Sequence, residues 1–519
     1  MPSTLPSRAL MGWMLAALAV LLGVQIFLWP HITDDAYITF RYALNLANGN
    51  GLAFNPGERV EGFSNPLWTL LLSGLHILTQ IDLPDLARSA GLLFAVGTVV
   101  CGIWILRKTA GRVSNEPVIF FLLFIILNPG FHVYATAGLE GPLLAFLLTA
   151  GTALSLVPTS RTQFSAALLL GFAGITRPEG PLYALLWFLA TLRPPFNVRG
   201  VWRNEAPRFL LMLLPIVAWH AFRFLFYGSL LPNTALAKIP GVFGEFIDFP
   251  EYVTPWLVAA GGPMVLLLWF VLPPRDESVR LVERIALVLT GANLIFVAYA
   301  RGDWMTFGRF IVPVWPVVAI GLSLWMSSIL TQLRESPSLR FRRALPFLPP
   351  AGIAFCALLA WYPSIEKYAT NEGMNMLMRG TDQLAVGEWI DRNIAPDATI
   401  ATGRLGGISY GAMENVVWDW FGLTDAEEAR FIRRGRPGTL KDDPVFSRNP
   451  DVIAAIEAPA DWSYKRTTQL MDFLEESYIF VLGFPQGRYG YVDIWIRKDR
   501  IREVLLTKDQ FILEGLDED

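Results

Sequence analysis

Two adjacent aspartates, Asp34 and Asp35, are the residues of this 519-residue chain best suited by type and position to do chemistry. They follow directly after the first long apolar run of the sequence. Adjacent carboxylates repel each other, and at a bilayer surface both are partly desolvated. A chain tolerates such a pair where it binds a cation, pairs with basic groups or carries out acid–base chemistry. Its position predicts that this chemistry takes place at the level of lipid headgroups.

Charged residues also interrupt later apolar runs, each time beside glycine or proline. Glu140 begins one run, and Arg177 and Glu179 lie in a break between two others. Charges this close to hydrocarbon are usually paired or functional. Two simpler alternatives remain open: a favourable interaction of Glu140 with a helix dipole, and a structural ion pair between Arg177 and Glu179.

Basic residues expected on the same membrane face as the aspartates are candidates for binding a phosphate group. Phosphate is bound by ammonium point charges and by guanidinium forks. The candidate phosphate-binding residues are Arg177, Arg223, Lys238, Arg301 and Arg309. The alternative is that these cations only neutralise nearby acids and lipid headgroups. Candidate substrate-binding residues in the same segments are Arg41, Asn55, Glu58, Glu61, Glu140, Glu179, Asn233 and Asp303.

Acids and cations gathered on one membrane face predict group transfer from a lipid phosphate. A prenyl-linked phosphate is already a good leaving group, so it needs cations rather than a protonated acid. The acceptor hydroxyl needs a base, which a single carboxylate can supply. If the anomeric configuration is retained, a carboxylate nucleophile or a tight ion pair is needed instead. Asp34 or Asp35 fits either role.

The composition of the chain indicates the elements that must position these residues. Hydrophobic residues make up 53% and charged residues only 17%, whereas soluble domains carry about a quarter charged residues. The chain is therefore expected to be a polytopic membrane protein. A net charge of -3 creates no global field that would attract nucleic acid. Cys101 and Cys356 lie in apolar runs and predict two buried thiols without a disulfide.

The basic flanks of the apolar runs predict a topology with the N-terminus in the cytoplasm. We take residues 66–80 as an interfacial segment, because counting it as a span would place Arg107 and Lys108 outside. The inner loops then carry roughly twice as many basic residues as the outer segments, as the positive-inside rule requires. The first run lacks a small-x-small cleavage site and is predicted to be a retained span. The eleven predicted spans are 10–30, 86–106, 117–131, 139–157, 162–176, 180–193, 208–226, 254–273, 283–300, 309–331 and 346–363.

Two domains follow from this pattern. Residues 1–363 are predicted to form a transmembrane catalytic domain, with a first extracytoplasmic loop at about 31–65. Residues 364–519 hold most of the acidic residues and predict a soluble α/β domain outside the cell. The helix expected there covers 383–394, and the strands cover 398–402, 416–420, 478–482 and 491–496. The glycine cluster at 403–411 lacks the spacing of a dinucleotide-binding loop.

The polar motifs together resemble the polytopic GT-C glycosyltransferases, most closely the arabinofuranosyltransferases that cap cell-wall arabinan. The resemblance is carried by residues 34–41, 51–62, 138–140, 176–180, 231–234, 302–303 and 421–425, and the first-loop match is the most specific. It implies a polytopic α-helical fold of about eleven transmembrane helices plus interfacial helices. It also implies a C-terminal extracytoplasmic α/β domain that can help to bind glycan.

The same resemblance implies an enzyme with Asp34 and Asp35 as its catalytic residues. Its donor would be a polyprenyl-phosphate sugar, with D-arabinofuranose as the expected sugar, and its acceptor a glycan or glycoconjugate. Transfer would occur at the outer face of the bacterial cytoplasmic membrane. Relatives of this kind differ in the sugar they transfer, so mannose or another hexose, moved to protein or lipopolysaccharide, remains an alternative.

Two other functions and one cofactor stay open at this point. A lipid-linked-sugar transporter would carry polar residues near mid-membrane, whereas His220 is a rare polar residue at the centre of a predicted span. A non-catalytic scaffold of an envelope complex is the other alternative. Asp34 and Asp35 could hold Mg²⁺ or Mn²⁺ together with a phosphate and waters. With four histidines and no His/Cys cluster, zinc is not expected.

Overall fold

The computed structural model of the chain forms two compact units. It describes residues 8–110, 114–192, 198–237, 249–272, 277–303, 305, 307–335, 348–369, 372–455, 464–485 and 491–506. The first unit comprises Met1–Trp29, Ala87–Ala221 and Phe246–Gly373, and the second Pro30–Leu86, Phe222–Glu245 and Met374–Asp519. The second unit thus joins the first loop to the C-terminal domain, whereas the sequence-based division assigned that loop to the transmembrane domain.

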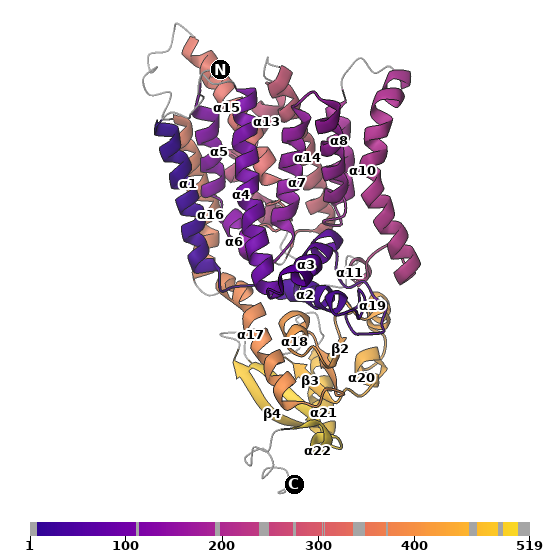
Figure 1. The fold of residues 1–519 in the computed structure, drawn as a ribbon. Helices are drawn as coiled ribbons and strands as arrows, with labels where there is room; N and C mark the ends of the chain where they lie inside the picture. Colours follow the sequence, from indigo (N-terminus) through magenta and orange to yellow (C-terminus); the bar gives the residue numbers. More distant parts are fainter. Residues whose placement is uncertain are drawn as a thin grey trace. The chain divides into compact units, whose positions relative to one another are not determined.

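The first unit is built of helices joined by short irregular segments, and each of the eleven predicted apolar runs coincides with a helix or a bent pair of helices (Figure 1). Helix α5 packs against α1, α15 and α16, while α14 packs against α9 and α15. Apolar segments fold this way because a helix satisfies all of its backbone polar groups internally. The helices are α1 (Arg8–Leu28), α4 (Leu83–Thr109), α5 (Glu116–Ile126), α6 (Pro129–Thr136), α7 (Gly141–Ser155), α8 (Ser160–Ala173), α9 (Gly180–Thr191), α10 (Val198–Tyr227), α12 (Phe249–Ala259), α13 (Gly262–Val271), α14 (Glu277–Ala300), α15 (Trp315–Glu335) and α16 (Leu348–Ala369).

Within the described part of the chain, five helices are long and apolar enough to cross a membrane. They are α1, α4 and the apolar parts of α10, α14 and α15. Two bent pairs, α5 with α6 at 65° and α12 with α13 at 67°, would raise the number to seven. The first bend follows from Pro129 and the second from Gly261 and Gly262, whose φ angles are positive. The predicted count of eleven spans stays a prediction, because α7, α8, α9 and the apolar part of α16 are shorter.

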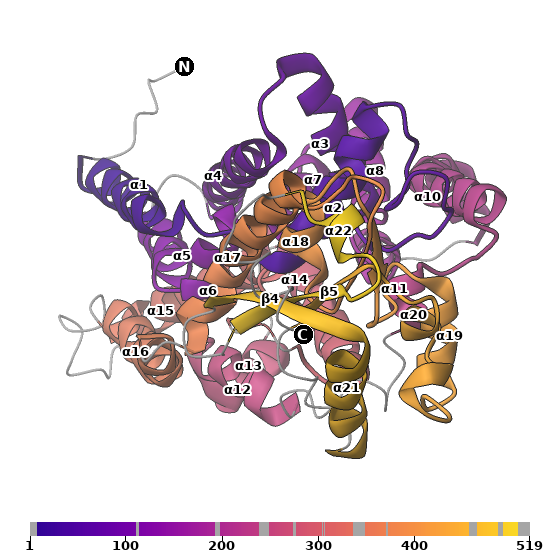
Figure 2. The same cartoon turned by 90° about the horizontal axis from the view of Figure 1, so that it is seen from below.

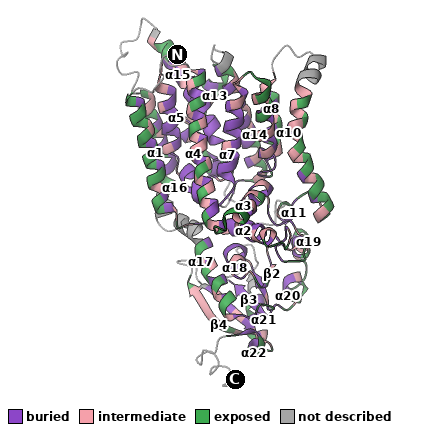
Figure 3. Ribbon diagram, in the orientation of Figure 1, coloured by how far each residue is buried: buried purple, intermediate pink, exposed green. Residues whose placement is uncertain are grey.

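Much of α1 and of the C-terminal part of α10 is exposed (Figure 3), and many of the exposed residues are large and apolar. Ile26 of α1 and Leu225 of α10 are more than four-fifths exposed, at 82% and 81%. An apolar surface of this extent is typical of contact with lipid. Both cysteines are free, but Cys101 and Cys356 are half-buried, so the prediction of fully buried thiols is wrong. His220 is also half-buried and bonds to the carbonyl of Ile216 in its own helix.

The second unit contains a five-stranded sheet in the order β2-β1-β3-β5-β4. Strands β1 (Thr399–Thr402), β2 (Val416–Asp419) and β3 (Val452–Ala455) run parallel. Strands β4 (Tyr478–Pro485) and β5 (Tyr491–Arg497) pair antiparallel with each other (Figure 2), and β5 also pairs antiparallel with β3. Four of these strands were predicted and are confirmed. Strand β3 was missed, because a run of only four residues gives little periodicity to detect.

The remaining elements of the second unit are helical. The predicted helix at 383–394 falls largely within α17, which ends at Asn393 and is therefore confirmed in type and place. Helix α3 has only 14 residues and is shorter than the roughly 20 residues of a perpendicular span. The helices are α2 (Asp34–Ala47), α3 (Pro66–Thr79), α11 (Asn233–Ala237), α17 (Glu372–Asn393), α18 (Leu405–Gly411), α19 (Ala426–Arg433), α20 (Pro444–Ser447), α21 (Tyr464–Ser477) and α22 (Ile501–Val504), with a 3₁₀ turn, η1 (Leu440–Asp442).

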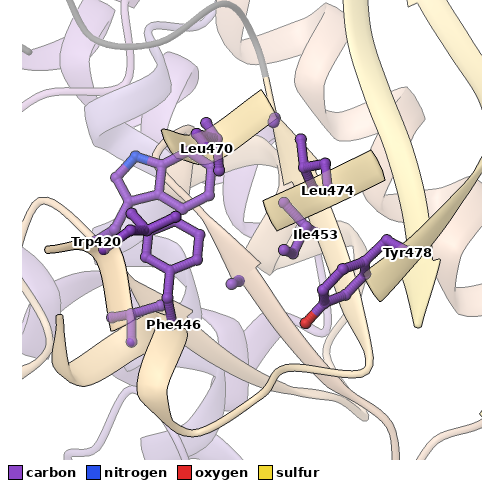
Figure 4. Close-up of a cluster of buried hydrophobic side chains, with 10 residues drawn as sticks. Trp420, Phe446, Ile453, Leu470, Leu474 and Tyr478 are labelled. Atoms are coloured by element: carbon purple, nitrogen blue, oxygen red, sulfur yellow. The ribbon is translucent and has the colours of Figure 1, made fainter. Parts of the chain in front are cut away.

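A compact apolar core holds the sheet of the second unit (Figure 4). Trp420 and Phe446 stack with ring centroids 5.5 Å apart, and Ile453 of β3 lies in the same cluster. The hydroxyl of Tyr478 donates to the carbonyl of Pro450 at 2.7 Å, so its one polar atom is satisfied. This core fixes the carboxyl ends of β1 and β2, the edge at which parallel α/β sheets commonly bind ligands.

Candidate active site

The carboxylate of Asp34 is held by the C-terminal domain. Asp34 is the first residue of α2, where the helix dipole favours negative charge. Its Oδ1 accepts a hydrogen bond from the backbone N–H of Gly407 at 2.8 Å, and its Oδ2 accepts one from Gly406 at 3.3 Å. Both glycines lie in the first turn of α18, which follows β1 directly. Asp34 and Asp35 are each half-buried.

The surroundings of Asp34 raise the pKa of its carboxyl group above the ordinary value for aspartate. The pKa of the Asp34 carboxyl is raised to about 6, chiefly by burial and also by the negative charge of Asp35. The N–H groups of Gly407 and Gly406 and the charge of Arg404 act in the opposite direction, because they favour the carboxylate. Asp34 is therefore largely ionised at neutral pH and remains able to accept a proton.

Arg41 fastens the first loop to the C-terminal domain. Its guanidinium is fully buried and donates to the carbonyls of Phe54 at 2.9 Å, of Ala412 at 3.1 Å and of Asn415 at 2.8 Å, and to that of Ser409. Burial lowers the pKa of Arg41 to about 10, which still leaves it charged at neutral pH. Arg41 was predicted to bind substrate, but these bonds commit its donors to the fold.

Asn55 makes a second bridge of the same kind. Its side-chain oxygen accepts from the N–H of Val417 at 3.0 Å, and its amide donates to the carbonyl of the same residue at 2.9 Å. Asn55 thus extends the hydrogen bonding of β2 as a neighbouring strand would. The same amide donates to Glu58 at 3.1 Å, and Glu58 itself lies exposed on the loop.

Glu61, Arg223 and Asn233 also serve the fold of the second unit. The Arg223 guanidinium donates to both carboxylate oxygens of Glu61, at 2.6 and 3.0 Å, in a buried bidentate pair. The side chain of Asn233 donates to the carbonyls of Gly422 at 2.7 Å and Leu423 at 3.1 Å. Arg223 therefore neutralises a nearby acid, which is the alternative to phosphate binding given above for these cations. Lys238 lies outside the described residues.

A second group of charged side chains lies in the first unit. Arg177 bonds to the carboxylates of Glu140 and Glu179, and all three side chains are buried. Arg309 pairs with Asp303 at 2.7 Å between Nε and Oδ2. The two arginines meet at one aromatic ring, since the guanidinium carbon of each lies 5.3 Å from the centroid of Phe310. The structure therefore contains the Arg177–Glu179 pair named above as an alternative.

Glu140 and Glu179 belong to the same tripeptide, Glu-Gly-Pro, which occurs twice in the first unit. Both acids stand before Gly-Pro, and both are the N-cap residues of apolar helices, α7 and α9. Proline at the start of a helix costs no hydrogen bond there, so Glu-Gly-Pro is a sound way to begin each helix. The remaining predicted phosphate ligand, Arg301, follows α14 with a φ of 56° and is exposed.

Sequence reasoning missed the partners of Asp34 in α18. No role was predicted for the glycine cluster at 403–411, because its spacing does not match a dinucleotide-binding loop. The available signal was a pair of consecutive glycines, Gly406 and Gly407, a few residues after a strand of a parallel sheet. Such glycines allow close approach of another backbone. What approaches here is the first turn of α2.

The described residues contain no group of three or more His, Cys, Asp or Glu side chains arranged to hold a metal ion. A divalent cation at Asp34 and Asp35 would therefore take its other ligands from a substrate phosphate and water. The chemistry of the two carboxylates is compatible with such a cation but does not require it.

The chain is similar in sequence to one family model and to two curated proteins. A family model described as a domain of unknown function, DUF8728, matches residues 374–499. Two curated relatives are each named terminal β-(1→2)-arabinofuranosyltransferase. The chain is 26% identical to the one from Corynebacterium glutamicum over 364 residues, which cover 60% of this chain and 51% of the relative. It is 34% identical to the one from Mycobacterium tuberculosis over 244 residues, covering 43% and 37%. The chain thus spans about half or less of the length of the curated relatives it matches.

Solved structures resemble the chain over nearly its whole length. ArnT from Cupriavidus metallidurans bound to undecaprenyl phosphate has a TM-score of 0.59 and 14% identity, covering 93% of this chain and 98% of ArnT. The apo oligosaccharyltransferase of Archaeoglobus fulgidus has a TM-score of 0.56 and 12% identity, covering 93% and 74%. At this identity the likeness shows the fold alone. The GT-C-like fold and the resemblance to arabinofuranosyltransferases, both expected from the polar motifs between residues 34 and 425, are confirmed.

Proposed function

We propose that the chain is a membrane glycosyltransferase that moves a sugar from a polyprenyl-phosphate donor to a hydroxyl group of a glycan or glycoconjugate. The observation that carries the proposal is the Asp34 carboxylate, which is half-buried, oriented by two backbone amides and adjacent to Asp35. The lipid donor is supported by the structural likeness to ArnT with undecaprenyl phosphate bound. The names of the two curated relatives favour D-arabinofuranose as the sugar.

In the proposed reaction a carboxylate of the acid pair accepts the proton of the acceptor hydroxyl. The hydroxyl oxygen forms a bond to the anomeric carbon of the donor sugar. The bond between that carbon and the phosphate oxygen breaks, and its electron pair leaves with the lipid phosphate. Asp34 is the preferred base, because a carboxyl with a pKa of about 6 is ionised at neutral pH and still basic enough to take a proton. A retaining reaction would use the same carboxylate as a nucleophile.

The departing phosphate needs positive charge nearby, and the predicted cations remain our candidates for it. Arg301 is exposed, whereas Arg177 and Arg309 are already paired with carboxylates. A phosphate can share a guanidinium with a carboxylate, because the guanidinium carries five donors. We further propose that the reaction takes place on the extracytoplasmic side of the bacterial cytoplasmic membrane, in accordance with the distribution of basic residues between the predicted loops.

The test is an activity assay of the full chain with acid-pair variants. The purified protein is given synthetic polyprenyl-phosphoryl-arabinofuranose and an arabinan oligosaccharide, and the product is measured by mass spectrometry. Asp34→Asn or Asp35→Asn is expected to lower kcat by at least about 10²-fold, the lower end of the effect of a general base. Asp397→Asn, an exposed aspartate of the C-terminal domain, is the matched control and should leave kcat unchanged. Full activity of both acid-pair variants would refute the proposed base.

Two further measurements separate the alternatives. Mass spectrometry of the surface glycan of a deletion strain should show the loss of one sugar, whose mass distinguishes a pentose from a hexose. A transporter or a scaffold would instead leave the purified protein without transferase activity. Assays after exhaustive chelation and after addition of Mg²⁺ or Mn²⁺ test the cation at Asp34 and Asp35. Undiminished activity after chelation would remove the cation from the proposal.

A further inference from the structure

The C-terminal domain is in contact with the proposed base itself. In parallel α/β sheets, ligands commonly bind beyond the carboxyl ends of the strands. In this chain the segment that follows β1 meets α2 instead, because Gly406 and Gly407 donate their backbone N–H groups to Asp34. The edge that would ordinarily receive a ligand thus receives a carboxylate from the first loop of the same chain.

Glycines are required for this approach at three positions. A Cβ atom on Gly406 would collide with the backbone carbonyl oxygen of Asp34. A Cβ on Gly407 would meet the carbonyl oxygen of Gly380 in α17, and a Cβ on Gly380 would in turn meet the carbonyl of Ile32 just before α2. Backbone packs directly on backbone at each of these contacts. The position of the Asp34 carboxylate is therefore set by α17 and α18 as much as by α2.

The contact also has an electrostatic side. Arg404 is half-buried, immediately precedes α18 and exerts a Coulombic attraction on Asp34. Together with the two N–H donors, it stabilises the charged form of a carboxylate that burial and Asp35 otherwise destabilise. The bonds of Arg41 to the carbonyls of Ser409, Ala412 and Asn415 keep the first loop and this segment in register.

We infer that the C-terminal domain is a working part of the catalytic centre. The backbone amides of Gly406 and Gly407 and the side chain of Arg404 act as positioning groups that orient the Asp34 carboxylate and keep it ionised. This inference rests on the proposed function, in which Asp34 is the base. It extends that function, since the domain would otherwise only help to bind the glycan acceptor.

The first experiment measures how kcat depends on pH in the full chain with Arg404→Gln. Loss of the positive charge should move the midpoint of the acidic limb upward by about one pH unit, with activity recovering at higher pH. Arg404→Lys retains the charge and should restore most of the wild-type profile. Arg433→Gln removes an exposed arginine of α19 and serves as the matched control. An unchanged profile in Arg404→Gln would overturn the electrostatic role.

The second experiment tests the position of the carboxylate through Gly406→Ala. A displacement of about 1 Å is expected to lower kcat by about 10²-fold, with a much smaller change in the KM for the donor. Gly74→Ala in α3 is the matched control, because a Cβ there meets nothing within 4 Å. Thermal unfolding and gel filtration establish that each variant is folded. If Gly406→Ala does not fold, the pH profile of Arg404→Gln decides the inference.

The outcomes separate the inference from the proposed function. If Asp34→Asn abolishes activity while Gly406→Ala and Arg404→Gln behave as wild type, the inference fails and the proposed base stands. If Asp34→Asn is fully active, the assignment of the base fails first. Loss of activity at every pH in Arg404→Gln, together with a raised KM for the donor, would assign Arg404 to the lipid phosphate and overturn its positioning role.

Discussion

The two charged regions of this molecule treat carboxylates in opposite ways. In the first unit, Glu140, Glu179 and Asp303 each face a guanidinium, from Arg177 or from Arg309. In the second unit, Asp34 is held by the neutral N–H groups of two glycines. An arginine partner neutralises a carboxylate, whereas backbone amides orient it and leave its negative charge in place. The comparison indicates that the ion pairs of the first region stabilise the fold as a frame, whereas the carboxylate of Asp34 stays available for the reaction proposed above.

Removing the arginine of the first region should have the largest effect on stability. Arg177→Met leaves two buried carboxylates unpaired, which is expected to cost about 3–5 kcal/mol. The measurement is thermal unfolding of the purified protein, with yield as a second readout. Replacing Glu140 and Glu179 by glutamine in the same variant should recover much of the loss. If Arg177→Met is as stable as wild type, the region is not a frame and the comparison breaks.

In the second region, the ionisation of Asp34 should make the stability of the protein depend on pH. The pKa of Asp34 is about 6 in the folded chain and 3.8 in the unfolded reference, so the folded state binds a proton more tightly. The contribution of this group to stability is therefore highest below about pH 4 and falls as the pH rises through 6. Asparagine does not titrate, so the Tm of Asp34→Asn relative to wild type should rise over this range and then level off. The change corresponds to at most about 3 kcal/mol.

The proposed transferase activity should depend on the same ionisation of Asp34, but with the opposite sign. The kcat of the wild type is expected to increase as the pH rises through about 6, because only the ionised Asp34 can accept a proton. A Tm difference between Asp34→Asn and wild type that does not change with pH would contradict the assigned burial. A kcat that is flat between pH 5 and 7 would contradict the assigned role.

A smaller effect is expected from the link that holds the second region together. Arg41→Lys keeps a positive charge but cannot reach the four carbonyls that the guanidinium serves. Leaving buried carbonyls unpaired should lower the free energy of unfolding by about 2 kcal/mol. Limited proteolysis should then cleave the chain more readily within the first loop and near α18, because these two segments are held together less firmly. Unaltered protease resistance would show that other contacts are enough to hold the first loop against the C-terminal domain.

The smallest effect concerns Gln383, which lies on α17 one turn after Gly380. Its side chain is fully buried, and neither its amide nitrogen nor its oxygen has a hydrogen-bond partner within the part of the chain that the structure describes. Gln383→Leu retains the shape and removes the polar atoms, so it should raise stability by about 1 kcal/mol. Thermal unfolding checks this. A destabilised variant would show that the amide is satisfied in the native protein.

The parts of the fold that depend on local sequence were predicted from it. Apolar runs located the helices of the first unit, and alternating residues located four of the five strands. The predictions were weaker where a contact joins distant residues. Arg41, Glu61 and Asn233 were predicted to bind substrate because polar residues in a glycine-rich loop often do so, yet the structure uses each of them to hold backbone or another side chain. Their partners lie far away in the chain, where a single sequence gives no signal.

The sequence by itself determined which segments are helices and where most of the strands lie, because these properties depend on residues within a few positions of one another. The tertiary structure alone decided what Asp34 touches. Gly406 is separated from it by 372 positions, and their contact exists only because α18, the helix that follows β1, packs against α2. Burial and hydrogen bonding to Asp34 follow from that contact, and they turn one of two neighbouring aspartates into the proposed base.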